Sequence, residues 1–438
     1  MVFVVSRLAY YAFGLRFDAS PATYFIQIMD VELLRTDLLR TLLYTHSQPP
    51  LFNLAIGIAL KLFPADSTGF QVTMGAGYAL LGLVEAFALY LVATGLGAGR
   101  RTALLVTAVH TILPTTLRYE NWLLYSHPIA ALMTLAAFLL HRALSTGRRA
   151  WAFAYFVSLA ALSLTRLTMN WMWFAVCAGA VIAAARREER RRLTALALGP
   201  AILVLSLTVR HLALFGSATT GDVFLGGSLS LKLHRELSAE QRADLVARKR
   251  ISPLFSTSIL ADIEVVKGLV PPLSPTGIPV ADADRKSTGS VNFNNLHYRA
   301  LSLLQFEEVR NVIHDYPLVY ARSVGRAVLQ SFAPAGTDPG LPRLVPGNFR
   351  QTPAPVLLLT MPFLLAFGLV RAVRSSEEGR AARVTFAFLV FNIVFLTAVT
   401  CAISYGDFSR YRFEVDSYYV VLLTVALSAL VEGVRAEW

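Results

Sequence analysis

The stretch "YTHSQPPLFNLAIGIALKLF", Tyr44–Phe63, decides how the chain is threaded through a membrane. Its double proline opens a run of 14 largely apolar residues, 50–63, which includes Lys61. A membrane-spanning helix needs about 20 apolar residues, so this run is too short for a comfortable span. We therefore predict an interfacial or re-entrant segment on the outer side. If the run crossed, every later loop would change sides.

Composition indicates the class of protein. The chain has 438 residues, of which 55% are hydrophobic and 16% charged, with a mean hydropathy of +0.54. Soluble globular proteins have about 25% charged residues. This composition predicts an all-α, polytopic integral membrane protein. The net charge of +12 does not indicate a nucleic-acid partner, because the basic residues cluster in short loops between apolar segments.

The sequence predicts ten transmembrane helices. They cover residues 2–15, 70–98, 103–117, 121–140, 151–165, 168–185, 193–213, 354–370, 384–403 and 417–432. The loops after the second, fourth, sixth and eighth spans are rich in arginine, and placing them in the cytoplasm satisfies the positive-inside rule. Both termini then lie inside. The first span is short and contains Arg7, so either Arg7 faces protein or the true start of the chain lies upstream.

Three parts follow from this topology. Residues 1–213 form an N-terminal transmembrane module with a first outer loop at 16–69. Residues 214–353 form an extracytoplasmic region with interfacial helices, and 354–438 the C-terminal transmembrane helices. In the middle part, residues 301–333 predict one amphipathic helix that carries too many charges for a span. The pair Gly226-Gly227 lacks the strand–turn–helix setting of a phosphate loop.

Polar residues gather at the outer ends of several predicted spans. In a bundle these turns converge on one interfacial cavity, and ionisable residues at such depth are usually functional or paired. Arginine binds phosphate oxygens in a bidentate manner and stabilises a departing phosphate. A nearby carboxylate would take a proton from an attacking hydroxyl. The residues thus indicate an extracytoplasmic site for a lipid phosphate, without naming a sugar.

The order of these motifs resembles the polytopic glycosyltransferases of the C-type fold. The resemblance is to bacterial relatives of the dolichyl-phosphate-mannose protein O-mannosyltransferases and to the lipid A aminoarabinose transferases. It rests on an acidic residue after the first span, "LRFDASP"; a His-Pro-Pro-Leu-like motif, "HSQPPLFN", with Ser47 and Gln48 inserted; and a closing "SRYRFEVDSYYVVLL". Segments "RYENWLLYSHPIAALMTLAAFLL" and "LSLTRLTMNWMWF" are similar to intermediate spans.

The resemblance implies an inverting transfer of a hexose or pentose from a polyprenyl-phosphate donor to a lipid, glycan or protein hydroxyl. Asp18 would be the catalytic base. The donor phosphate would be bound by His46, Arg166, Arg410 and Arg412, and the substrate by Gln48, Glu120, Tyr125, His127 and Asn294. Asp18 is followed by Ala19 where relatives carry an acidic pair, so no cofactor is predicted with certainty, although a divalent cation stays open; the histidines show no metal-ligand spacing.

Plainer interpretations stand beside these roles. Asp18 would serve equally as a helix N-cap, His46 as a hydrogen-bonding group of its turn, and the arginines as interfacial anchors. Glu120 and His127 would fit a buried structural pair.

Two other functions stay open at this point. A transporter or flippase of a lipid-linked glycan also needs a cationic cavity, and an inactive relative would only bind lipid. Arginine-rich, lysine-poor usage suggests a high-GC bacterium, and therefore the bacterial inner membrane. The predicted topology has the active site facing the periplasm or exterior.

Overall fold

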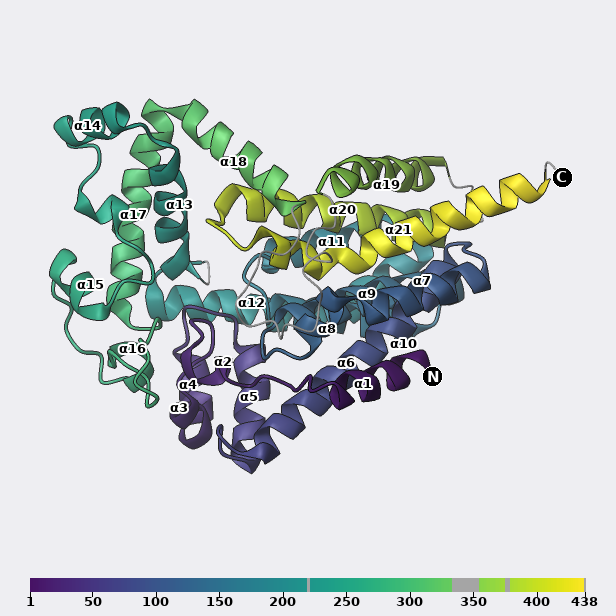
Figure 1. Ribbon diagram of the computed structural model, residues 1–438, viewed down its shortest axis with the longest axis horizontal. Helices are drawn as coiled ribbons and strands as arrows, with labels where there is room; N and C mark the ends of the chain where they lie inside the picture. Colours follow the sequence, from purple (N-terminus) through teal and green to yellow (C-terminus); the bar gives the residue numbers. More distant parts are fainter. Residues whose placement is uncertain (219–220, 333–353, 375–378, 437–438) are drawn as a thin grey trace.

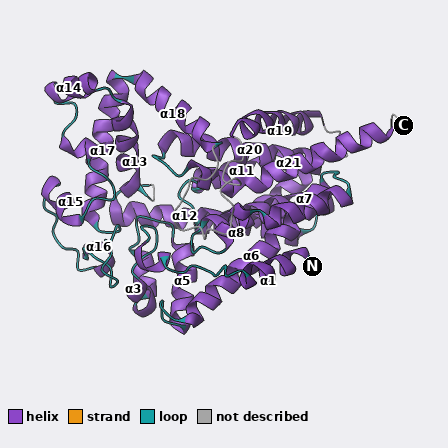
Figure 2. Ribbon diagram, in the orientation of Figure 1, coloured by secondary structure: helices purple, strands orange, loops and turns teal. Residues whose placement is uncertain are grey.

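The computed structural model of the chain describes residues 1–218, 221–332, 354–374 and 379–436. Every named element in these ranges is a helix, and extended pairing is limited to two isolated bridges, Asp18–Trp122 and Arg285–Val291 (Figure 2). The helices form a bundle, which holds both chain ends, and an outer group, α13 to α18, beside it (Figure 1). The predicted all-α membrane architecture is confirmed.

The bundle holds the most apolar helices. Five are long and apolar enough to cross a membrane: α6 (Thr68–Gly95), α9 (Ser126–Thr146), α12 (Arg187–Phe215), α20 (Arg380–Ile403) and α21 (Phe408–Ala436). The bundle also contains α1 (Val2–Ala12), α7 (Arg100–Ile112), α8 (Pro114–Glu120), α10 (Arg149–Ser163), α11 (Trp171–Ala184) and α19 (Ala354–Arg374). The count of ten spans stays a prediction.

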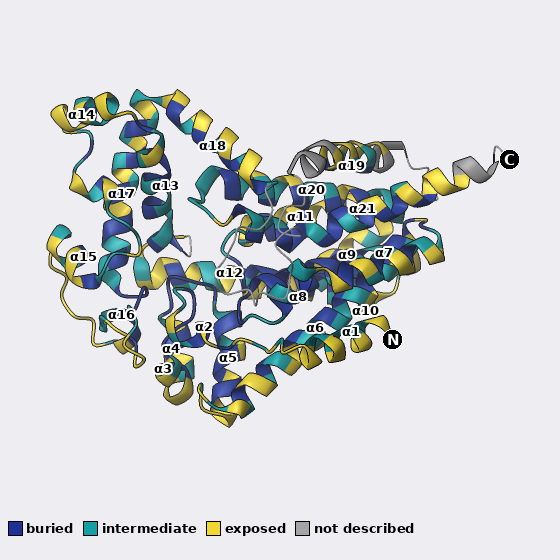
Figure 3. Ribbon diagram, viewed as in Figure 1, coloured by how far each residue is buried: buried dark blue, intermediate teal, exposed yellow. Residues whose placement is uncertain are grey.

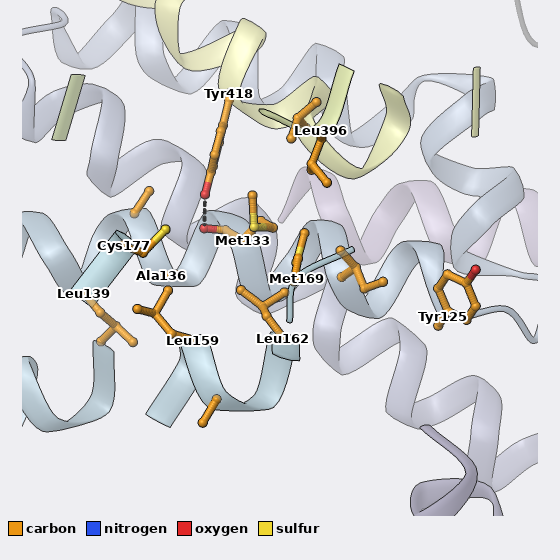
Figure 4. Close-up of a cluster of buried hydrophobic side chains, with 14 of the residues drawn as sticks. Tyr125, Met133, Ala136, Leu139, Leu159, Leu162, Met169, Cys177, Leu396 and Tyr418 are labelled. Carbon is orange, nitrogen blue, oxygen red and sulfur yellow. Dashed lines mark hydrogen bonds between the residues drawn. The ribbon is translucent and has the colours of Figure 1, made fainter. Parts of the chain in front are cut away.

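Helix α9 is the centre of the bundle, where buried residues concentrate (Figure 3). It packs against α6, α10, α20 and α21. The hydroxyl of Tyr418 donates to the carbonyl oxygen of Met133 at 2.7 Å (Figure 4), and Thr134 donates to Ser417 at 2.7 Å. Such hydrogen bonds hold helices together where lipid supplies no hydrophobic drive between them. They fix α21, which carries the closing arginine motif, onto α9.

Prolines break two segments that the sequence predicts as single helices. The span predicted at 103–117 is divided at Leu113 into α7 and α8, and Pro114 begins α8. The helix predicted at 301–333 is divided at Tyr316 into α17 (Leu296–Asp315) and α18 (Pro317–Ser331). Proline has no N–H to donate and disfavours helical geometry in the residue before it. At both places the helix ends before the proline, so both predictions of one continuous helix are wrong.

The first outer loop folds into short helices against the bundle. These are α2 (Pro21–Tyr24), α3 (Val31–Thr36), α4 (Leu38–Leu43) and α5 (Pro50–Leu62). The apolar run after the double proline is thus helical, and its place on the outer side stays a prediction. Buried Asn53 of α5 accepts from the backbone of Met29 at 2.9 Å and donates to the carbonyl of Gln27 at 3.1 Å. This amide ties α5 to the segment that follows Asp18.

The outer group is a compact helical unit. It comprises α13 (Asp222–Glu236), α14 (Ala239–Ala247), a 3₁₀ turn at Pro253–Ser256, α15 (Ile263–Leu269), α16 (Pro279–Asp282), α17 and α18. Helices α13 and α17 pack so closely that a Cβ on Gly226 would lie 1.8 Å from the Ser302 carbonyl oxygen. The glycine pair therefore serves helix contact.

Candidate functional site

Asp18 is held by its backbone and leaves its carboxylate exposed. Its N–H donates to the carbonyl of Asn121 at 2.8 Å, and its own carbonyl accepts from Leu123 at 3.0 Å, which forms the bridge with Trp122. The carboxylate oxygen Oδ1 accepts from the backbone of Ser20 at 2.9 Å. Within the described ranges no arginine or lysine forms an ion pair with Asp18. The group thus caps its turn and still presents a free carboxylate edge to solvent.

A second group of side chains gathers around two tyrosines at the start of α9 and of α21. The Arg166 guanidinium donates to the Tyr125 hydroxyl at 2.6 Å and lies 4.6 Å from the Tyr411 ring centroid. Arg410 donates to the Tyr411 hydroxyl at 3.2 Å and lies 5.9 Å from the Tyr125 centroid. Both arginines are more than nine-tenths buried. Residues distant in the chain thus form one cluster, the arginine cluster: Tyr125, Arg166, Arg410, Tyr411 and Glu414.

The charges in the arginine cluster do not balance. Glu414 Oε2 lies 3.1 Å from Arg166 Nε and is fully buried. The nearest carboxylate to Arg410 is that of Asp407, at 3.5 Å, which is 71% exposed. Among the described residues, Nε and Nη1 of Arg410 are buried and have no hydrogen-bond partner. Buried N–H groups of a cation are rarely left unsatisfied, so this arrangement has the chemistry of an anion-binding site.

One short segment joins Asp18 to the arginine cluster. Residues 121–123 hold the backbone of Asp18, and Tyr125 follows two residues later. From the same segment, Tyr119 stacks on Phe413 of α21 with ring centroids 4.2 Å apart, one turn beyond Arg410. Asp18 and the arginine cluster therefore flank one segment, although Asp18, Tyr125, Arg166 and Arg410 are far apart in sequence.

Arg412 does not join this cluster. It donates to the carbonyl of Ser331 at 2.9 Å and to Asp416 at 3.2 Å, toward α18. A displacement of two positions along a helix turns a side chain to nearly the opposite face. The structure thus brings together Arg166, Arg410 and Tyr125 of the predicted site and separates Arg412 from them.

His46 lies in a buried junction with the outer group. Its Nε2 lies 2.8 Å from the carbonyl oxygen of Asn294, whose side-chain oxygen accepts from the backbone N–H groups of His46 and Ser47 at 3.0 and 3.1 Å. Burial lowers the pKa of His46 to about 3, so the ring is neutral and donates through Nε2. Gln48 is buried as well. A neutral, buried ring that is already bonded to a carbonyl matches the turn role better than phosphate binding.

Glu120 and His127 are buried but do not pair with each other. Both carboxylate oxygens of Glu120 accept from Arg7, so Arg7 faces protein, as the first alternative for this span requires. His127 donates from Nε2 to the carbonyl of Tyr78 at 3.1 Å, and its Nδ1 lies 3.7 Å from Glu85. These contacts tie α1, α6, α8 and α9 together, away from the arginine cluster.

Tyr411 and Glu414 belong to the cluster and were not among the predicted site residues. Arg410 and Glu414 are four positions apart, so helical spacing places them on one face. That signal was available in the closing motif. For a divalent cation, no three His, Cys, Asp or Glu side chains converge in the described parts of the chain.

No protein-family model and no curated protein matches the chain. Among solved structures, the oligosaccharyltransferase AglB from Archaeoglobus fulgidus, in complex with an inhibitory peptide and a dolichol-phosphate, overlaps 97% of this chain and 50% of its own, at 13% identity and a TM-score of 0.42. ArnT from Cupriavidus metallidurans, bound to undecaprenyl phosphate, overlaps 91% of this chain and 76% of its own, at 13% identity and a TM-score of 0.33.

The chain spans about half the length of the archaeal oligosaccharyltransferase. These neighbours agree with the resemblance that the motifs carry, to polytopic membrane glycosyltransferases.

Proposed function

We propose that the chain is an inverting glycosyltransferase of the C-type fold, which moves a hexose or pentose from a polyprenyl-phosphate donor to an acceptor hydroxyl. The observation that supports this most is the convergence of Arg166 and Arg410 beside the segment that holds Asp18, since two guanidinium nitrogens of Arg410 have no hydrogen-bond partner among the described residues. The reaction takes place on the extracytoplasmic face of a bacterial inner membrane, and the acceptor is a lipid, glycan or protein.

In this reaction Asp18 acts on the acceptor hydroxyl, and the two arginines act on the donor phosphate. The free edge of the Asp18 carboxylate takes the proton of the acceptor hydroxyl as its oxygen attacks the anomeric carbon. The bond from that carbon to the phosphate oxygen breaks, and its electron pair stays on the phosphate. The guanidinium groups of Arg410 and Arg166 stabilise the charge that develops there. Attack opposite the leaving phosphate inverts the anomeric configuration.

The neighbours of the arginines fix their position. Glu414 pairs with Arg166. The hydroxyl group of Tyr125 accepts a hydrogen bond from Arg166, and that of Tyr411 accepts one from Arg410. These contacts hold both planar groups before the donor arrives. A cation that is already in position stabilises the transition state more than a mobile one does, because little reorganisation is needed during the reaction.

The test is release of polyprenyl phosphate from polyprenyl-phosphate hexoses and pentoses by the purified protein, with lipid, glycan and peptide acceptors. We expect Asp18→Asn to lower kcat by about 10²–10⁴-fold, the usual contribution of a general base. Asp66→Asn is the matched control, because Asp66 is an exposed carboxylate of the same outer loop, and it should keep full activity.

Arg410→Gln separates the phosphate role from the base. Removal of one donor to a developing oxyanion costs about 10²–10³-fold in rate, and here the Km for the donor should rise as well. Equal turnover by a folded Asp18→Asn variant would contradict the base assignment. No release by the wild type from any donor would overturn the proposed reaction and favour transport.

A further inference from the structure

Lys232 of α13 is a buried cation that no step of the proposed reaction uses. It is only 6% exposed, although lysine is rarely buried without a partner. Among the described residues it forms no ion pair, and Glu236, one turn away, pairs instead with Arg326 at 3.1 Å. Burial lowers the pKa of the ammonium group to about 8, so it stays largely protonated at pH 7. Such a charge needs a specific partner nearby.

The partner is the end of a helix of the bundle. The Lys232 ammonium donates to the carbonyl oxygen of Cys401, and the carbonyl oxygen of Ala402 lies 3.4 Å away. Both belong to the last turn of α20, whose carbonyl groups lack partners within the helix and carry its negative dipole. The Tyr320 hydroxyl of α18 donates to Ala402 as well, at 3.4 Å. The outer group thus caps α20.

The outer group also contacts the turn between α20 and α21. The guanidinium of Arg235, one residue from the end of α13, lies 4.0 Å from the Tyr405 ring centroid. Within the described parts of the chain no heavy atom lies within 4 Å of the Cβ position of Gly406, and Asp407 has a φ of +60°, which is unusual outside glycine. A turn with this backbone has little packing of its own, so contacts from outside set its shape.

Arg410 stands directly after this turn. Its N–H donates to the carbonyl of Asp407 at 3.0 Å in the first turn of α21, and the Phe408 ring centroid lies 5.9 Å from the Lys232 ammonium. A shift of the turn would move the start of α21, and with it the guanidinium of Arg410. The buried lysine is therefore linked through one helix end and one turn to the arginine cluster.

We propose that Lys232 is a positioning residue for the anion site: by capping α20 it fixes the turn from which Arg410 projects toward the donor phosphate. This inference rests on the proposed function of Arg410. It also means that the outer group contributes to the donor site, since α13 supplies both Lys232 and Arg235.

The test separates donor binding from general stability. Lys232→Met removes the charge and keeps the length of the side chain; it should raise the Km for the donor about tenfold, on the scale of one lost charge-assisted hydrogen bond. We expect kcat to fall as well, by up to about tenfold, because Arg410 also stabilises the charge on the departing phosphate, whereas proton transfer to Asp18 is untouched. Lys232→Arg, which keeps the charge, should recover most of the wild-type Km. Lys249→Met, on an exposed lysine of the outer group, is the control and should change neither constant.

Each outcome either supports or overturns the proposed role of Lys232. A folded Lys232→Met variant with lower thermal stability but normal Km and kcat would overturn the inference, since the lysine would then be structural only. If that variant does not fold, Arg235→Gln tests the same turn and should raise the donor Km about threefold, as the loss of a partly exposed cation–π contact predicts; an unchanged Km would again overturn it. If Arg410→Gln also leaves the donor Km unchanged, the proposed phosphate role of Arg410 has failed. If Arg410→Gln raises the donor Km and Lys232→Met does not, only the proposed role of Lys232 has failed.

Discussion

The buried junction of His46 predicts a defined loss of stability in acid. An unperturbed histidine has a pKa of about 6.5, whereas burial lowers the pKa of His46 to about 3. Between these values the unfolded chain binds a proton that the folded protein excludes, so stability falls as the pH drops below 6.5. Above that pH the full contribution is present.

The magnitude follows from the two pKa values. At pH 7 the unfolded imidazole gains about 0.2 kcal/mol from protonation, and at pH 5 about 2 kcal/mol. The step from pH 7 to pH 5 should therefore cost about 2 kcal/mol through His46 alone. A folded-state pKa one unit higher would change this figure by less than about 0.1 kcal/mol.

His46→Gln isolates this contribution. The glutamine side chain can place an N–H where Nε2 donates to Asn294, but it does not titrate. Denaturant unfolding in mixed micelles, followed by tryptophan fluorescence at pH 7 and pH 5, should show that the wild type loses about 2 kcal/mol more than His46→Gln. His314→Gln, on a histidine that is 81% exposed, is the control and should lose as much as the wild type. The same loss in His46→Gln and wild type would refute the reasoning.

Three further predictions concern the bundle, the outer group and the topology. Arg166→Met leaves Glu414 buried without its cation and should cost about 3–5 kcal/mol of unfolding free energy; Arg166→Met combined with Glu414→Gln should recover much of it, and no recovery would show that the pair is not the cause. Gly226→Ala places a Cβ 1.8 Å from a backbone oxygen of α17 and should cost at least about 2 kcal/mol, whereas Gly325→Ala on open α18 should stabilise by about 0.5–1 kcal/mol; equal effects in a thermal unfolding assay would argue against close packing of α13 on α17. Ser274→Cys, on an exposed loop of the outer group, should react with a membrane-impermeant maleimide on intact cells, because both native cysteines are buried; labelling only after permeabilisation would reverse the predicted topology.

Hydropathy predicted the presence of the helices better than the residues at which they begin and end. The long apolar segments are helices in the structure, since burial in lipid requires every backbone group to bond within its own segment. The two divided helices show what hydropathy misses. Pro114 and Pro317 stand inside segments of suitable composition, and the local rule for proline indicates a break at each; the rule alone is not sufficient, because α12 continues through Pro200.

The site was predictable only in part, because its contacts are tertiary. Arg166 and Arg410 were selected as outer-face arginines, and the structure brings them to the same two tyrosines. Helical periodicity would have placed Arg410 and Glu414 on one face and turned Arg412 away from it, but only the structure shows that Arg412 contacts Ser331 of the outer group. His46 was selected for its place in a motif, and its partner lies 248 residues further along the chain.

That partner, Asn294, has a consequence for the order of folding during synthesis. Its amide accepts from two backbone groups of the first outer loop and donates to the carbonyl groups of Tyr44 and Val280. A nascent chain that ends before residue 294 can insert its first seven predicted spans, yet it lacks the group that closes the loop after Asp18. Contacts of such high sequence separation form late. The first outer loop should thus remain open to proteases on a stalled nascent chain and become protected only after the outer group has been synthesised, so that the loop and the outer group reach their folded state together.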